Sequence, residues 1–167
     1  DDMINTRRRE VDALVASRFA ELEAQGHGPQ RHEGAVTRQM LEDRVMRGFD
    51  PMTGSRADGV TGRRHNRPPI ASRITSEASF VGADSIIRRS PEYHAAREAA
   101  LFDPNFREGH FVVVLPIEDV LGRDYLSQVE GLRRVKGSSI PEQVDFQGGS
   151  VRAVYRINPD GKPDLIT

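Results

Sequence analysis

The chain has 167 residues, enough for one domain with a buried core, and a formal net charge of −1. It contains no cysteine, which excludes disulfides, zinc–thiolate sites, iron–sulfur clusters and thiol nucleophiles. Its longest apolar run, Phe111 to Ile117, is too short to cross a bilayer. Of the 24 basic residues only Lys136 and Lys162 are lysines, so nearly all the cations are arginines, which can hold two phosphate oxygens at once.

The first predicted element is an amphipathic helix over residues 7–25, which Gly26 ends. Its expected apolar stripe consists of Val11, Leu14, Val15, Phe19 and Leu22. A second helix is predicted over residues 36–47, with Thr37 as the N-cap and Gly48 as the C-terminal stop.

Residues 48–70 form a long irregular segment with many turn signals. Between Arg56 and Arg73 the chain places five arginines and His65 against a single acid, Asp58. A loop of this length inside a domain is usually either functional or disordered. Two interpretations therefore stay open: a solvated mobile loop, and a flap that grips a polyanion.

The rest of the chain alternates between short helices and strands. An extended piece over 70–74 leads into a helix over 76–89, for which Ser76 is a good N-cap, and Pro91 begins another short helix. Residues 111–115 are the clearest buried strand. Two further strands, over 151–157 and 165–167, are joined by a turn at 158–161 and predict an antiparallel hairpin.

This order of elements predicts an α+β fold, in which N-terminal helices are followed by a small antiparallel sheet. Residues 1–28 are expected to be a leading helix and linker, and residues 29–167 the functional domain. The last residues, 164–167, resemble a strand that stops before its natural end, so we expect the C-terminus to be truncated.

The motifs of nucleotide-dependent, hydride-transferring and serine hydrolase enzymes are missing from the sequence. Its five histidines show no i, i+4 pairing, and no acidic cluster has the spacing of a calcium or magnesium loop. We therefore expect no cofactor and no metal ion. Acid–base chemistry by His, Arg, Ser, Thr and Tyr remains.

Cleavage of RNA is accessible to such residues because the 2′-hydroxyl of RNA is its own nucleophile. The reaction needs a base for that hydroxyl, an acid for the leaving 5′-oxygen, and a cation for the crowded phosphate. His32 can exchange a proton near neutral pH, and Arg44, on the predicted helix that follows, can hold an oxyanion. A role for His32 as a cap of that helix, and for Arg44 as a surface ion-pair partner, stays open.

Four segments in order carry a resemblance to a known family. They are Arg31-His32, the Leu41-x-x-Arg44 spacing, Ala71-Ser72-Arg73-Ile74-Thr75 before the helix at Ser76, and the closing Asp164-Leu165-Ile166-Thr167. Together they resemble the ribonuclease-A-like C-terminal toxin domains of bacterial polymorphic toxins, of the contact-dependent inhibition and Rhs types. The resemblance covers residues 31–90 and 150–167. The lysine of the family's histidine segment is absent, and the insertion at 48–70 is large.

The resemblance implies a ribonuclease-A-like fold and a secreted toxin that cleaves RNA, with tRNA among the candidate substrates, in the cytoplasm of target bacteria. It implies a cognate immunity protein as partner, a monomer or a toxin–immunity heterodimer, and no membrane association. The implied catalytic residues are His32, Arg44, Thr167 and Ser72. The basic segment adds the candidate substrate-binding residues Arg63, Arg64, His65 and Arg73.

Two other functions stay open. The stretch from Arg73 to Glu77, with Glu142 as the acid, has a superficial likeness to ADP-ribosyltransferase toxins, although the spacing fits poorly. The third alternative is a non-catalytic module of a large secreted protein, in which replacing His32 or Arg44 changes stability alone.

Overall fold

Helices dominate the first hundred residues and strands dominate the remainder. The structure is a computed structural model that describes residues 2–103 and 109–167. The helices are α1 (Asp2–Gln25), α2 (Gly28–His32), α3 (Arg38–Arg47), α4 (Glu77–Arg88), α5 (Pro91–Phe102), α6 (Ile117–Leu121) and the short 3-10 turn η1 (Tyr125–Ser127). The strands are β1 (Ile70–Ile74), β2 (His110–Pro116), β3 (Val129–Arg133), β4 (Glu142–Gln143), β5 (Ser150–Ile157) and β6 (Pro163–Leu165).

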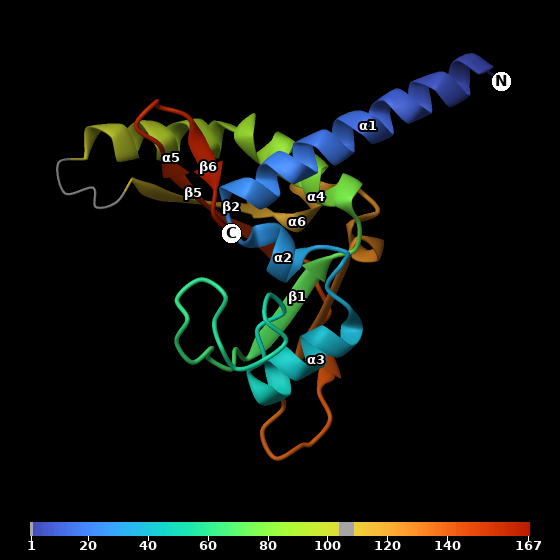
Figure 1. The fold of residues 1–167 in the computed structure, drawn as a ribbon, viewed down its shortest axis with the longest axis vertical. Helices are drawn as coiled ribbons and strands as arrows, with labels where there is room; N and C mark the ends of the chain where they lie inside the picture. Colours follow the sequence, from blue (N-terminus) through green and yellow to red (C-terminus); the bar gives the residue numbers. More distant parts are fainter. Residues whose placement is uncertain (1, 104–108) are drawn as a thin grey trace.

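The strands form two antiparallel three-stranded sheets, in the orders β1-β3-β4 and β2-β5-β6. The predicted α+β class is confirmed, but the strands are divided between two sheets instead of making one. The expected hairpin is present as β5 and β6, in which Tyr155 pairs with Leu165. Figure 1 shows the second sheet in the upper part of the molecule beside α1, α4 and α5, and β1 with α3 in the lower part.

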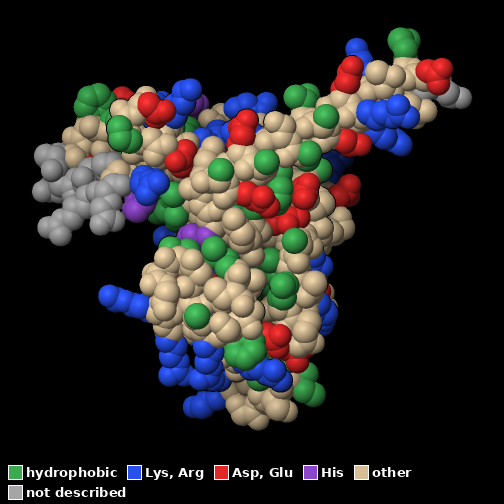
Figure 2. Space-filling model, viewed as in Figure 1, with side chains coloured by type: hydrophobic (Ala, Val, Ile, Leu, Met, Phe, Trp, Pro, Cys, Tyr) green, Lys and Arg blue, Asp and Glu red, His purple; other side chains and the backbone are tan. Residues whose placement is uncertain are grey.

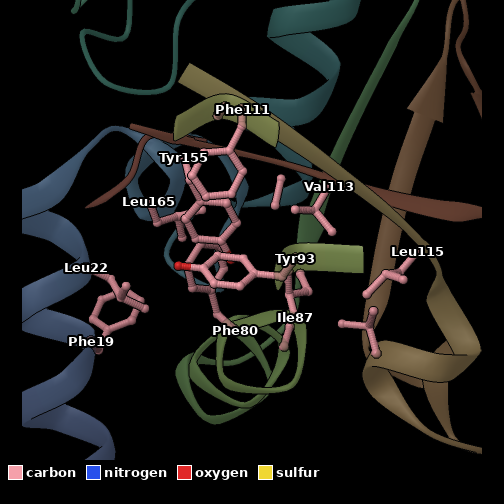
Figure 3. Close-up of a cluster of buried hydrophobic side chains, with 14 residues drawn as sticks. Phe19, Leu22, Phe80, Ile87, Tyr93, Phe111, Val113, Leu115, Tyr155 and Leu165 are labelled. Atoms are coloured by element: carbon pink, nitrogen blue, oxygen red, sulfur yellow. The ribbon is translucent and has the colours of Figure 1, made fainter. Parts of the chain in front are cut away.

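The larger core lies on the sheet β2-β5-β6. Strand β2 alternates as its sequence requires, with Phe111, Val113 and Leu115 buried and Val112 and Val114 exposed. Figure 3 shows how α1 and α4 bring Phe19 and Phe80 toward the aromatic rings of this sheet. The buried aromatic group is extended by Tyr93 and Tyr155, whose ring centroids lie 5.1 Å apart at an edge-to-face angle of 84°.

A smaller core joins α3 to the sheet β1-β3-β4. Leu41 and Val45, on one face of α3, pack with Ala71 of β1 and Leu132 of β3. Both predicted ends of this helix are confirmed: Thr37 Oγ1 accepts a hydrogen bond from the Met40 amide at 3.2 Å, and Gly48 takes the left-handed conformation at φ 74°. The local signals at the two ends therefore determine the length of α3.

The predicted apolar stripe of the first helix is wrong over its N-terminal half. Phe19 and Leu22 are buried, but Val11 and Leu14 are 57% and 70% exposed. Figure 1 shows the reason: this half of α1 extends away from the body of the molecule, so no surface lies against its apolar side chains. No helix in the described part of the chain is both long enough and apolar enough to cross a membrane.

The junction between α1 and α2 packs closely against the backbone of Leu165 and Ile166. A Cβ added at Gly26 would meet the Leu165 carbonyl oxygen and would lie 2.6 Å from the Ile166 carbonyl oxygen. We expect Gly26→Ala to lower the free energy of unfolding by about 1–3 kcal/mol, because backbone has to move. Urea unfolding measures this change.

The matched control is Gly82, which lies inside α4 with open space around its Cα. Gly82→Ala should raise the free energy of unfolding by about 0.5–1 kcal/mol, because alanine is the better helix former. Equal effects of the two substitutions would contradict the close packing at Gly26.

Candidate active site

A cavity of about 310 Å³ lies where the two sheets meet. Its walls come from β1 and β3 of one sheet, from β5 and β6 of the other, and from α2, α4 and the C-terminal residue. Three of the four predicted catalytic residues line it: His32, Ser72 and Thr167. These residues are far apart in the sequence, so only the tertiary fold brings them to one cavity.

His32 is the last residue of α2, and does not cap the helix that follows. Its Nδ1 lies 3.2 Å from the carbonyl oxygen of Ser72 on β1. The carbonyl can only accept a hydrogen bond, so in the neutral ring the proton is on Nδ1 and Nε2 carries the lone pair. Burial, followed by the charge of Arg44, lowers the pKa of His32 to about 4. At pH 7 the ring is therefore neutral, in the form that can accept a proton.

Arg44, on α3, is the fourth predicted catalytic residue. It is not among the residues that line the cavity, but its charge acts on His32 and lowers the pKa of that residue. Arg44 forms no ion pair with the described residues, and its buried Nε has no hydrogen-bond partner among them. Burial and the charge of Arg31 lower the pKa of Arg44, which still stays protonated. Asp50 and Asp58 act on Arg44 through their charges but form no direct ion pair with it, so its guanidinium can still contact an anion.

Ser72 and Thr167 contribute to the cavity in different ways. The backbone carbonyl of Ser72 orients the imidazole of His32, and Ser72 also forms part of the cavity wall. Thr167 is fixed by its backbone, because its carbonyl oxygen accepts a hydrogen bond of 2.7 Å from the Val154 amide of β5. Its hydroxyl makes no hydrogen bond to any residue of the described chain, so it remains a donor for a ligand.

Arg73 lies apart from the other predicted substrate-binding residues, Arg63, Arg64 and His65. Arg73 lines the cavity, but its Nε and Nη2 donate to Glu130 Oε2 at 2.9 and 2.7 Å, so this cation is already compensated. Arg63 and Arg64 are exposed in the loop between α3 and β1. His65 is buried, and its Nδ1 lies 3.0 Å from Asp58 Oδ2.

The segment between α3 and β1, called here the arginine loop (residues 48–69), is held to α2 by a buried ionic network. Arg31 Nη2 lies 2.7 Å from Asp50 Oδ2 and 3.1 Å from Asp58 Oδ2. Asp50 is fully buried and also accepts hydrogen bonds from the amides of Met52 and Gly59. These donors lower the pKa of Asp50 to about 2, although burial opposes the shift. The arginine loop is therefore anchored through Asp50 and Asp58, while its residues 53–57 and 59–64 are exposed.

The sequence does not reveal this network, because Asp50-Pro51 and Asp58-Gly59 predict only turns. Both aspartates do form such turns: Asp58 Oδ1 accepts hydrogen bonds from the amides of Val60 and Thr61. The second carboxylate oxygen of each then contacts Arg31. Each aspartate thus both forms a turn and pairs with Arg31, and only the turn has a local sequence signal.

Three side chains of the network have the composition of a metal site, although the spacing of the acids and histidines in the sequence predicts none. The ligand atoms of Asp50, Asp58 and His65 lie within 4.8 Å of one another. However, Arg31 Nη2 already lies between the two carboxylates, at 2.7 and 3.1 Å. A guanidinium thus supplies the positive charge there, and the network does not fit a metal ion.

The remainder of the cavity is mostly apolar, with Phe80, Ile87 and Phe146 among its walls. Its carboxylate, Asp84, is committed within the fold, because it accepts hydrogen bonds from Tyr155 Oη at 2.8 Å and from Arg88 Nε at 3.0 Å. The cavity thus combines the polar groups of His32, Ser72 and Thr167 with largely apolar walls, a lining that is typical of ligand-binding sites.

No family model, curated protein or solved structure matches the chain.

Proposed function

We propose that the chain is a metal-independent endoribonuclease, and that the cavity at His32 is its active site. The observations that carry the proposal are a neutral, oriented histidine, an arginine outside the cavity lining whose charge acts on that histidine, and a hydroxyl in the cavity lining that has no partner among the described residues. These are His32, Arg44 and Thr167, which the expected chemistry requires as base, phosphate cation and hydrogen-bond donor.

In the proposed reaction, His32 Nε2 removes the proton of the RNA 2′-hydroxyl, and the 2′-oxygen attacks the adjacent phosphorus. The bond from phosphorus to the 5′-oxygen breaks, and the imidazolium of His32 returns the proton to that leaving oxygen. Arg44 and the Thr167 hydroxyl hold the phosphate oxygens as charge builds up. The products are a 2′,3′-cyclic phosphate and a free 5′-hydroxyl.

The ADP-ribosyltransferase alternative finds less support at this site. Its proposed acid, Glu142, is exposed on β4 and pairs with Arg133 at 3.2 Å. None of the glutamates in the described part of the chain lines the cavity. Its proposed arginine, Arg73, is occupied by Glu130.

The proposal extends to the biological setting. We infer a toxin domain, delivered by a contact-dependent or related secretion route into the cytoplasm of target bacteria. A cognate immunity protein would bind the chain in the producing cell as a heterodimer. The RNA substrate, with tRNA as one candidate, would be the only other partner.

Incubation of the purified chain with total bacterial RNA in EDTA tests the proposed activity. We expect cleavage fragments that end in 2′,3′-cyclic phosphates, because the 2′-hydroxyl is the nucleophile. A matched oligonucleotide with 2′-deoxyribose at every position should stay intact. Cleavage of that DNA, or cleavage of RNA that stops in EDTA, would contradict the mechanism.

The lowered pKa of His32 predicts an unusual pH dependence. Its neutral form is present above about pH 4, so kcat/KM for RNA should hold from pH 7 to about pH 5 and decline below pH 4. The decline of kcat at acid pH should begin at a higher pH than that of kcat/KM, because the bound phosphodiester anion stabilises the imidazolium and raises the pKa of His32 in the complex. A stopped-flow or gel assay across pH gives both profiles. An acid limb of kcat/KM near pH 6.5, the ordinary histidine value, would contradict the assignment of His32 as the buried base.

A further inference from the structure

A second hollow, of about 310 Å³, lies at the C-terminal end of α3 and is lined by arginines. We call it the arginine hollow; its charged lining consists of Arg47, Arg56, Arg64 and Arg67, beside His65. Figure 2 shows basic side chains gathered at the lower left of the molecule, where Figure 1 places α3 and the arginine loop. The hollow shares no lining residue with the cavity at His32.

The arginines are anchored there by the end of the helix. Arg56 Nε donates to the Arg47 carbonyl oxygen at 3.2 Å, and Arg67 Nη1 donates to the Met46 carbonyl oxygen at 3.3 Å. The last carbonyls of a helix lack intrahelical partners and attract cations. Each guanidinium has five N–H donors, so most donors of both side chains remain for a ligand.

The positive charge of the hollow is largely uncompensated. Within the described ranges, Arg56, Arg64 and Arg67 form no ion pair with a carboxylate, and Arg47 reaches Asp43 only at 3.8 Å. Like charges crowded at one hollow repel one another unless an anion lies between them. Planar guanidinium groups match the oxygens of a phosphate particularly well.

His65 supplies an independent sign of a ligand. Its side chain is only 7% exposed, and its Nδ1 is directed at Asp58 Oδ2. Its Nε2 is buried and has no hydrogen-bond partner among the described residues. Buried polar atoms almost always have partners, so an unpartnered ring nitrogen in the wall of a basic hollow points to a ligand. With Nδ1 on Asp58, Nε2 of an imidazolium donates to an anionic oxygen, and Nε2 of a neutral ring accepts from a hydroxyl.

We propose that the arginine hollow binds a backbone phosphate of the RNA substrate, at a subsite separate from the cavity where the strand is cut. The choice of RNA rests on the proposed function, whereas the recognition of phosphate rests on the hollow alone. Asp58 connects the two places, because it contacts both His65 in the hollow and Arg31, the neighbour of His32. One strand lying over the arginine loop would then engage both.

The test is binding of a short 2′-O-methylated RNA, which cannot be cleaved, measured by fluorescence anisotropy at low salt. The variant Arg64→Glu reverses a charge in the hollow, and the Arg64 side chain makes no hydrogen bond within the described chain. We expect its Kd to rise about tenfold or more, the effect of losing one phosphate contact, and the salt dependence of binding to become shallower. Arg123→Glu, at an exposed turn after α6, is the matched control and should change Kd less than about threefold.

Equal losses in the two variants would show general charge attraction and would overturn the subsite, as would failure of the wild type to bind. A competition arm with inorganic pyrophosphate distinguishes the source of the phosphate. If only high concentrations of pyrophosphate displace the oligonucleotide, the ligand of the hollow is a polynucleotide. If pyrophosphate binds as tightly as the oligonucleotide, the proposal of an RNA subsite is overturned. Because the oligonucleotide is not cleaved, binding that is lost in Arg64→Glu would support the subsite even if the wild type failed to cut natural RNA.

Discussion

We expect His32→Gln to lower the rate of RNA cleavage in EDTA by about 10²–10⁴-fold, the contribution of one positioned proton-transfer group. Glutamine is close to histidine in size, and its amide can still donate to the Ser72 carbonyl, which His32 Nδ1 contacts at 3.2 Å. It has no lone pair that can take a proton near neutral pH. The chain should therefore keep its fold and its affinity for uncleavable RNA, and lose kcat.

The control is His94→Gln on α5, where His94 is exposed and lies outside the cavity. This variant should cleave RNA at the wild-type rate, which tests that the loss is specific to His32. Urea unfolding of both variants separates a chemical defect from a folding defect. If His32→Gln retained more than about a tenth of the wild-type kcat, His32 would not be the base.

The elements that could be predicted from the sequence are those whose ends are determined by local chemistry. Ser76 caps α4 through the Ser79 amide, and Gly48 ends α3, as their residue types predict. Strand β3 was not predicted, because the sequence Val129–Arg133 has no clear alternation. It forms because β1 pairs with all five of its residues. Periodicity alone also could not tell that Val11 and Leu14 have no surface to cover.

In the candidate site, too, residue types could be read from the sequence, whereas the features that depend on tertiary contacts could not. The chemistry of His32 and Arg44 was predictable from residue type, since few other residues can exchange a proton or hold an oxyanion without a metal. The tautomer of His32 depends on a carbonyl 40 positions away, and its lowered pKa depends on burial that only the fold produces. The burial of His65 could not be predicted for the same reason, because it depends on the contact with Asp58, which also contacts Arg31 on α2.

The largest expected loss of stability comes from Asp50→Asn in the network that holds the arginine loop to α2. Asp50 is fully buried, and Arg31, its partner at 2.7 Å, is 8% exposed. Removing one partner of a buried ion pair leaves the other charge uncompensated, at a cost of about 3–5 kcal/mol. Asp58 still contacts Arg31, so we expect a loss near the lower end, about 3 kcal/mol, in urea unfolding.

The same variant should remove part of the acid sensitivity of the chain. The pKa of Asp50 is lowered to about 2, so its stabilising effect is complete above its ordinary pKa of about 3.9 and is lost as the pH falls toward 2. The unfolding free energy of Asp50→Asn should therefore decline less than that of the wild type between about pH 4 and 2. Glu142→Gln, which breaks the exposed pair with Arg133, is the control and should cost less than about 1 kcal/mol. Parallel pH profiles for the wild type and Asp50→Asn would show that the ionised Asp50 does not hold the loop.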